Sequence, residues 1–220
     1  MSLENIHLRK LLKIFYSEPR HQVTELRSDI RQEIAKDSGT SPGGGDFHGP
    51  FWRDARDHVF HLRELHDAVN ARVENNTRRD RLYPALRDGF LQWWNERRRW
   101  TNEPFEPIEA PHARIALEGL GTVKVENVLA VGDAGGGRHF IYPYFAEQPA
   151  LPDEGGRIGL WLMAQALPQA EPNDLRILDV IRGRTFSLDR TPLQGDESAI
   201  FRRRYGALLS RWQSLWEEYE

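Results

Sequence analysis

The sequence contains no cysteine, few lysines and no long apolar run. Without cysteine, the chain has no disulfide bridge, no thiolate nucleophile and no cysteine-bound metal. No apolar stretch approaches the ~20 residues needed to cross a bilayer. The first residues are charged and amphipathic and lack the apolar core of a signal peptide. We therefore expect a cytoplasmic protein with no membrane partner.

The net charge of the chain is not that of a protein that binds polyanions through its overall charge. The chain has 30 basic and 33 acidic residues, which give a formal net charge of −3. Nearly all of its basic residues are arginine, since the lysines are Lys10, Lys13, Lys36 and Lys124. This preference fits recognition of phosphate or carboxylate by guanidinium groups, and it fits equally the codon usage of a GC-rich genome.

Residues 122–189 carry the clearest structural pattern, which predicts strand, hairpin, strand, helix and strand. The first strand is rich in valine over 122–133, and the glycines after Asp133 favour a tight turn. The expected second strand contains Ile141–Phe145, a helix lies within 154–167, and the third strand covers 175–181. Because a helix between two strands normally crosses the face of the sheet, we expect the third strand beside the first two.

Helical periodicity surrounds this core and predicts an α+β protein with an α/β core. N-terminal helices precede a small mixed sheet flanked by helices, and a long C-terminal helix closes the chain. The expected helices cover 3–17, 22–36, 50–75, 83–100 and 196–219, with a glycine-rich loop at 37–45 and a proline-rich connector at 104–111. We expect a helical hairpin and linker in 1–45, a helical region in 46–110 and the core in 111–220. Alternatively, residues 46–220 form one compact domain.

The expected helix 50–75 carries a weak candidate for a metal site. His58 and His61 are three residues apart, so on one helix they could converge on an ion, and Glu64 continues the series. The spacing of a metalloprotease motif is absent. The alternative is the ordinary polar face of a helix.

Two arginine triplets are the candidates for nucleic-acid contact. Arg97, Arg98 and Arg99 follow two tryptophans, so they could bind the backbone while the aromatic rings stack on bases. Alternatively, they pair with nearby glutamates while the tryptophans pack in the core. Arg202, Arg203 and Arg204 lie near the start of the last helix, where the dipole disfavours cations. They therefore predict an anion or an acidic partner, or else a solvated face.

From about Phe47 to the C-terminus, this order of elements resembles the PD-(D/E)XK nuclease superfamily, in particular its RecB-like branch. The resemblance implies an acidic metal ligand on the first strand and an acid-x-Lys motif on the second. Such a site would hold a divalent cation with two carboxylates and activate water with the lysine.

The catalytic pattern of that family is incomplete in this chain. The first ligand would fall at Glu126 or Asn127, with Lys124 on the same strand but outside the family's position. The second strand reads IYPYF over 141–145 and carries neither acid nor lysine. Pro143 also lacks a backbone donor, which predicts a strand edge or a bulge. The resemblance therefore implies a relative that has lost its active site.

We expect a non-catalytic interaction module with a nuclease-like fold, acting in a nucleic-acid-processing or defence assembly and requiring no cofactor. Its expected partner is a protein, with nucleic acid as a second ligand class. A structural or regulatory protein without a nucleic-acid role is the alternative. A second alternative is a metal-dependent phosphodiesterase with an atypical site, and a divalent metal is expected only in that case.

Overall fold

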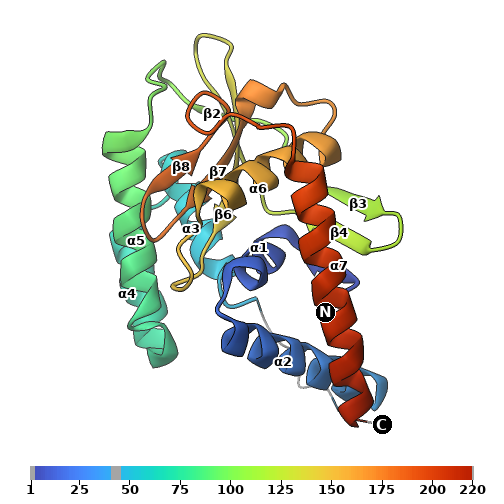
Figure 1. The fold of residues 1–220 in the computed structure, drawn as a ribbon. Helices are drawn as coiled ribbons and strands as arrows, with labels where there is room; N and C mark the ends of the chain where they lie inside the picture. Colours follow the sequence, from blue (N-terminus) through green and yellow to red (C-terminus); the bar gives the residue numbers. More distant parts are fainter. Residues whose placement is uncertain (1–2, 41–45, 220) are drawn as a thin grey trace.

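The computed structural model describes residues 3–40 and 46–219, and its chain path is shown in Figure 1. The glycines at 43–45 in the expected loop lie outside the described residues. The helices are α1 Leu8–Tyr16, α2 Pro19–Asp37, α3 Gly49–Val59, α4 Leu65–Asn75, α5 Leu82–Gln92, α6 Asp153–Ala166 and α7 Glu197–Trp216. Shorter helical segments are η1 Thr77–Arg79, the π-helical turn η2 Trp93–Arg97, η3 Pro172–Asp174 and η4 Glu217–Tyr219. The strands are β1 Asn5–His7, β2 Glu106–Pro107, β3 Ala113–Leu117, β4 Gly121–Val125, β5 Leu129–Gly132, β6 Arg138–Tyr144, β7 Leu175–Asp179 and β8 Arg184–Phe186.

The main sheet is mixed and has the strand order β2-β5-β6-β7-β8. The β5–β6 hairpin is antiparallel, β6 and β7 run parallel, and β8 returns antiparallel to β7. The predicted α+β class with a mixed sheet flanked by helices and a long C-terminal helix is therefore confirmed. Of the first two predicted strands, the third pairs with the second and not with the first, because α6 carries the chain across the sheet face to the far side of β6.

Side chains on β6 alternate between two hydrophobic clusters, one on each face of the main sheet. Tyr142 belongs to a cluster with α1, α2, α6 and α7, whereas its neighbour Ile141 packs with α3, α4 and α5. Figure 1 shows α4 and α5 on one side of the sheet and α6 and α7 on the other. The fold is thus built in layers, with helices covering both faces of one sheet.

A second sheet has the order β1-β4-β3 and joins the N-terminus to the middle of the chain. β1 lies parallel to β4, so a strand stands where the sequence predicted the beginning of a helix over 3–17. The strand β3 was also not predicted. Leu3 accepts a hydrogen bond from the Tyr205 hydroxyl at 2.6 Å, which ties this segment to α7.

The prediction of one continuous strand over 122–133 is wrong. The segment divides into β4 and β5, which belong to different sheets, at Asn127, whose φ is +66°. The Asn127 carbonyl accepts a hydrogen bond from Trp52 Nε1 at 2.7 Å, so a side chain of α3 stabilises the break.

The helix predicted over 50–75 is likewise two helices. The chain leaves α3 after Val59, and His61 adopts φ of +57° before α4 begins. Leu62, at the break between the two helices, is consequently 75% exposed. The two helices pack as a hairpin in which buried Asp54 accepts two hydrogen bonds from Arg72, at 2.9 and 3.2 Å.

Pro143 lies in a central strand, not at a sheet edge or in a bulge. The β5 ladder ends at Ile141, and Pro143 is paired with Leu178 on the β7 side only. The missing donor therefore falls past the end of the neighbouring strand, which explains why proline is tolerated here.

Tight packing explains the glycines at the start of α6. A Cβ on Gly156 would lie 2.2 Å from the Phe186 ring, and one on Gly159 would lie 2.2 Å from Ile177 Cδ1. The glycines thus allow the helix to approach the sheet closely.

Among the described residues, no helix has both the length and the apolar character required to cross a membrane.

Candidate anion-binding site

The residues expected at a nuclease-like site do not form a divalent-metal site. Lys124 on β4 pairs in register with His7 on β1 and Arg114 on β3. Glu126 Oε1 lies 3.3 Å from Arg114 Nε, and its Oε2 lies 3.8 Å from His7 Nδ1. Asn127 forms the turn into β5. Glu126 is thus engaged with basic side chains, and these residues do not fit the two-carboxylate metal site that the resemblance implies.

The histidines at 58 and 61 do not share a helix, so the geometric basis of the expected metal pair is wrong. His58 Nδ1 lies 3.2 Å from the Arg63 carbonyl, while Glu64 Oε2 lies 3.9 Å from the same nitrogen. His61 lies beyond the end of α3. In the part of the chain that the structure describes, no group of three or more His, Asp or Glu side chains could hold a metal ion.

The triplet on α7 is spread over several directions around the helix. Arg204 is engaged with Glu154 at 2.6 Å and lies 4.8 Å from the centre of the Tyr16 ring. Arg202 donates to the Glu118 carbonyl at 3.3 Å, and Arg203 is exposed. These three arginines therefore do not converge on one position.

Two arginines of the other triplet are engaged in the fold. Arg97 donates to the carbonyls of Arg182 and Gly183, at 2.7 and 3.3 Å. Arg98 pairs with Glu103 at 2.8 Å and lies 4.1 Å from the centre of the Trp94 ring. The expected alternative, in which glutamates pair with this triplet, holds for Arg98.

The tryptophans of this region are not available for base stacking. Trp93 and Trp94 are 1% and 5% exposed. Trp100 is covered by the His139 ring, which stacks on it with centroids 4.0 Å apart and an interplanar angle of 14°. One face of the remaining tryptophan is thus already occupied, which disfavours the base stacking that sequence-tolerant binding of single strands uses.

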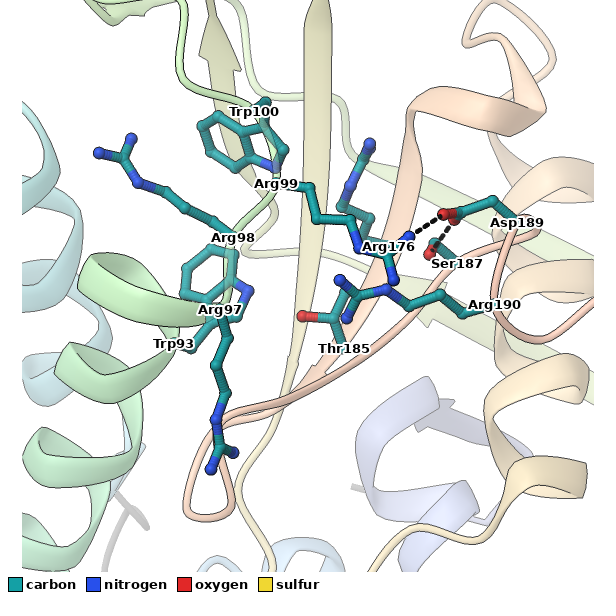
Figure 2. Close-up of a pocket in the computed structure, with 10 residues that line it drawn as sticks. All are labelled: Trp93, Arg97, Arg98, Arg99, Trp100, Arg176, Thr185, Ser187, Asp189 and Arg190. Carbon is teal, nitrogen blue, oxygen red and sulfur yellow. Dashed lines mark hydrogen bonds and ion pairs between the residues drawn. The ribbon is translucent and has the colours of Figure 1, made fainter.

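Arg99 instead lies at a small hollow, of about 50 Å³, between the end of α5 and the strands β7 and β8 (Figure 2). Arg176 on β7 and Arg190 after β8 also line it, as do Thr185, Ser187 and Asp189. The remaining lining residues are Trp93, Arg97, Arg98 and Trp100. In Figure 2, the side chains of Arg99 and Arg190 reach toward each other above Thr185.

The hollow contains more positive charge than its acidic group can balance. Asp189 pairs with Arg99 at 3.3 Å and accepts a hydrogen bond from the Ser187 hydroxyl, which is the main reason that the pKa of Asp189 is lowered. Arg176 donates to the backbone carbonyls of Asp174 and Asn173, at 2.8 and 3.4 Å, and no ion pair joins it to an acidic side chain of the described residues. Burial lowers the pKa of Arg176, while Asp174 and Asp189 act in the opposite direction and Arg190 adds a smaller lowering effect. A half-buried guanidinium beside a second cation is costly unless an anion joins it.

Thr185 contributes an unused hydroxyl to the same hollow. Its Oγ1 is buried and has no hydrogen-bond partner among the described residues. Buried polar atoms are normally paired, so this hydroxyl is a donor that a ligand entering the hollow could use.

The wall of the hollow is held by a small polar network in the β5–β6 turn. Asp133 Oδ1 accepts hydrogen bonds from the backbone of Gly135 and Gly137, both at 2.9 Å, and Oδ2 lies 3.0 Å from His139 Nε2. His139 stacks on Trp100. It is 7% exposed and supports the segment that carries the arginine triplet.

Sequence reasoning missed Arg176, Arg190 and Thr185. They occupy separate strands and a turn, and only the pairing of β7 with β8 brings them beside Arg99. The density of arginine and hydroxyl residues in 182–191, RGRTFSLDRT, is the signal that could have indicated them.

A larger groove, of about 1350 Å³, lies between α1, α2, α5 and the segment after β6. Its charges compensate one another: Arg9 pairs with Asp46 at 3.1 Å, Lys13 with Glu25 at 2.6 Å, Lys10 with Asp29 at 2.7 Å and Arg81 with Glu147 at 2.7 Å. The arginine-lined hollow, in contrast, has an excess of one sign.

Comparison with known proteins identifies no relative, since no protein-family model, no curated protein and no solved structure matches this chain.

Proposed function

We propose that this chain is a non-catalytic interaction module that binds a phosphate-bearing partner, with nucleic acid as the ligand class, through the arginine-lined hollow. The observation that carries the proposal is that Arg99, Arg176 and Arg190 line one small hollow, in which Asp189 is the acidic lining residue and pairs with Arg99. Guanidinium groups bind phosphate oxygens in a bidentate manner, so this arrangement matches a phosphate better than a neutral ligand.

The residues of the expected nuclease site support a role without catalysis. Hydrolysis of a phosphodiester by the family's mechanism needs two carboxylates on a divalent ion and a lysine near the scissile phosphate. Glu126 pairs with Arg114 and lies near His7, and the segment 141–145, where the acid-x-Lys motif would fall, carries neither acid nor lysine. The module would therefore hold its ligand without cutting it, as part of a larger assembly.

Binding of labelled single- and double-stranded DNA and RNA, followed by fluorescence anisotropy across a salt series, tests the proposal. We expect Arg190→Gln and Arg99→Gln each to weaken binding by about tenfold and to reduce the salt slope by about one, because each removes a phosphate contact. The matched control is Arg203→Gln, an exposed arginine of the α7 triplet outside the hollow, which should bind like the wild type.

The same assay distinguishes the alternatives. Loss of affinity in Arg203→Gln alone would move the interface to α7. Absence of salt-sensitive binding to any nucleic acid would reject the proposal and favour a module that binds only protein. Cleavage in magnesium or manganese that is lost in Glu126→Ala would instead identify a phosphodiesterase.

A further inference from the structure

We propose that the hollow receives a phosphate monoester, that is, a terminal phosphate group, and not the phosphodiester of a continuous strand. This inference rests on the proposed function and specifies the chemistry of its ligand. It is argued from the charge, the size and the free donors of the site.

The charge balance favours a dianion. Arg99, Arg176 and Arg190 contribute three positive charges, and Asp189 contributes one negative charge, which leaves two positive charges uncompensated. Arg97 and Arg98 do not add to this balance, because the Arg97 side chain points away from the other arginines in Figure 2 and Arg98 is paired with Glu103. A phosphate monoester carries a charge of about −1.5 to −2 at pH 7, whereas each diester carries only about −1.

The size of the hollow favours a single compact group. Its volume of about 50 Å³ is far below the several hundred Å³ of a typical small-molecule pocket. Because Trp93 is buried and Trp100 is stacked on His139, the walls offer little aromatic surface to a base. The anionic end of a ligand can therefore enter, while the group that carries it stays outside.

The free donors match the oxygens of such a group. The exposed guanidinium groups of Arg99 and Arg190 each present a planar fork that suits two phosphate oxygens. The Thr185 hydroxyl, buried and unpaired in the described structure, could donate to a third oxygen. The Ser187 hydroxyl is already committed to Asp189, so Thr185 is the hydroxyl available to the ligand.

The test compares oligonucleotides of one sequence that end in a 5′-phosphate, a 3′-phosphate or a hydroxyl group, at one salt concentration. We expect a phosphorylated end to bind about tenfold more tightly than the hydroxyl end, as the loss of a charge-assisted contact implies. Inorganic phosphate and a mononucleoside monophosphate, used as competitors in separate arms, show whether the phosphate group alone, a nucleotide or a strand end is the preferred source.

The variants separate this inference from the proposed function. Thr185→Val keeps the shape of the side chain but removes the hydroxyl, and it should reduce the preference for the phosphorylated end several-fold while binding of the hydroxyl end stays unchanged. Arg190→Gln should abolish the preference, and Arg203→Gln should leave it intact. Thermal melting of each variant confirms that it is folded.

Each outcome supports or rejects the monoester inference, the proposed function or both. Equal affinity for phosphorylated and hydroxyl ends, still weakened by Arg190→Gln, would overturn the inference and leave the proposed function standing. Binding of inorganic phosphate in the absence of any strand binding would reject nucleic acid as the ligand class and support the monoester site. If neither phosphate nor any strand binds, both proposals are wrong.

Discussion

His48, at the start of α3, shows how burial sets the titration of a single residue in this molecule. Its ring stacks flat on Phe145, with centroids 4.8 Å apart and an interplanar angle of 5°. Desolvation lowers the pKa of His48 to about 4, and Arg9 and Lys13 act in the same direction while Asp46 opposes them. The folded protein therefore keeps this histidine neutral at pH values where the unfolded chain protonates it.

We expect His48 to make the protein less stable in mild acid. The pKa of His48 in the folded protein lies below the unfolded value of 6.5. The stability that the neutral, buried ring contributes is therefore fully present above pH 6.5 and is lost as the pH falls toward about 4. The loss should be on the order of 2 to 3 kcal/mol in the free energy of unfolding. Urea denaturation of the wild type and of His48→Phe, which keeps an aromatic stack, measures it.

The comparison between the two proteins isolates His48 from carboxylates that titrate in the same range. His48→Phe should show a flatter dependence of stability on pH than the wild type. Identical pH profiles would contradict the assignment.

At the scale of elements, the position of α5 depends on a glycine. A Cβ on Gly89 would lie 2.2 Å from the backbone carbonyl oxygens of both Val180 and Ile181, in the turn after β7. The same turn receives the Arg97 side chain at Gly183. The close approach of α5 to this turn therefore places the arginine segment at the hollow.

Gly89→Ala should destabilise the protein by about 2 kcal/mol or more, because backbone atoms cannot move aside as a flexible side chain can. Gly206→Ala in α7 is the matched control: its nearest contact would be Leu120 at 3.8 Å, so the better helix propensity of alanine should stabilise the protein by up to about 1 kcal/mol. Chemical denaturation measures both, and equal effects of the two substitutions would reject the packing argument.

Elements also show where sequence patterns stop being informative. The valines on either side of Asn127 continue one strand pattern, and the apolar residues on either side of His61 continue one helical pattern, yet the chain turns at both positions. Asn and His are among the non-glycine residues that tolerate positive φ, so local propensity allows these turns without requiring them. The Trp52 bond to Asn127 and the Asp54–Arg72 pair, which stabilise the turned arrangement, join residues far apart in the sequence.

At the scale of the whole molecule, the main sheet links the two hydrophobic clusters. Adjacent residues of β6 contribute side chains to the two clusters in turn. The Tyr142 hydroxyl also accepts a hydrogen bond from the backbone N–H of Arg9 at 3.0 Å, which ties α1 to the sheet. The N-terminal helices share their cluster with α6 and α7. The two clusters should consequently unfold together.

Leu12→Ala and Phe90→Ala probe the clusters separately. Each removes a fully buried side chain and should lower the free energy of unfolding by about 2–5 kcal/mol. Both should shift one shared transition, with tryptophan fluorescence and far-UV circular dichroism coincident. A separate early transition in Leu12→Ala would show that the segment 1–45 unfolds as a unit of its own.

The sequence by itself determined the fold class, the order of the core elements, the long α7 and the β5–β6 hairpin, because helical periodicity and turn chemistry are local properties. It also indicated that the acid and lysine of a nuclease site are absent from β6. Tertiary structure alone decided that β7 pairs with β6 and not with β5, that β1 adds to β4, and that Arg97, Arg98 and Arg99 have different roles. It also brought Arg176 and Arg190 to Arg99 across 77 to 91 positions of sequence. Contacts over such separations depend on strand pairing and packing, which no local pattern encodes.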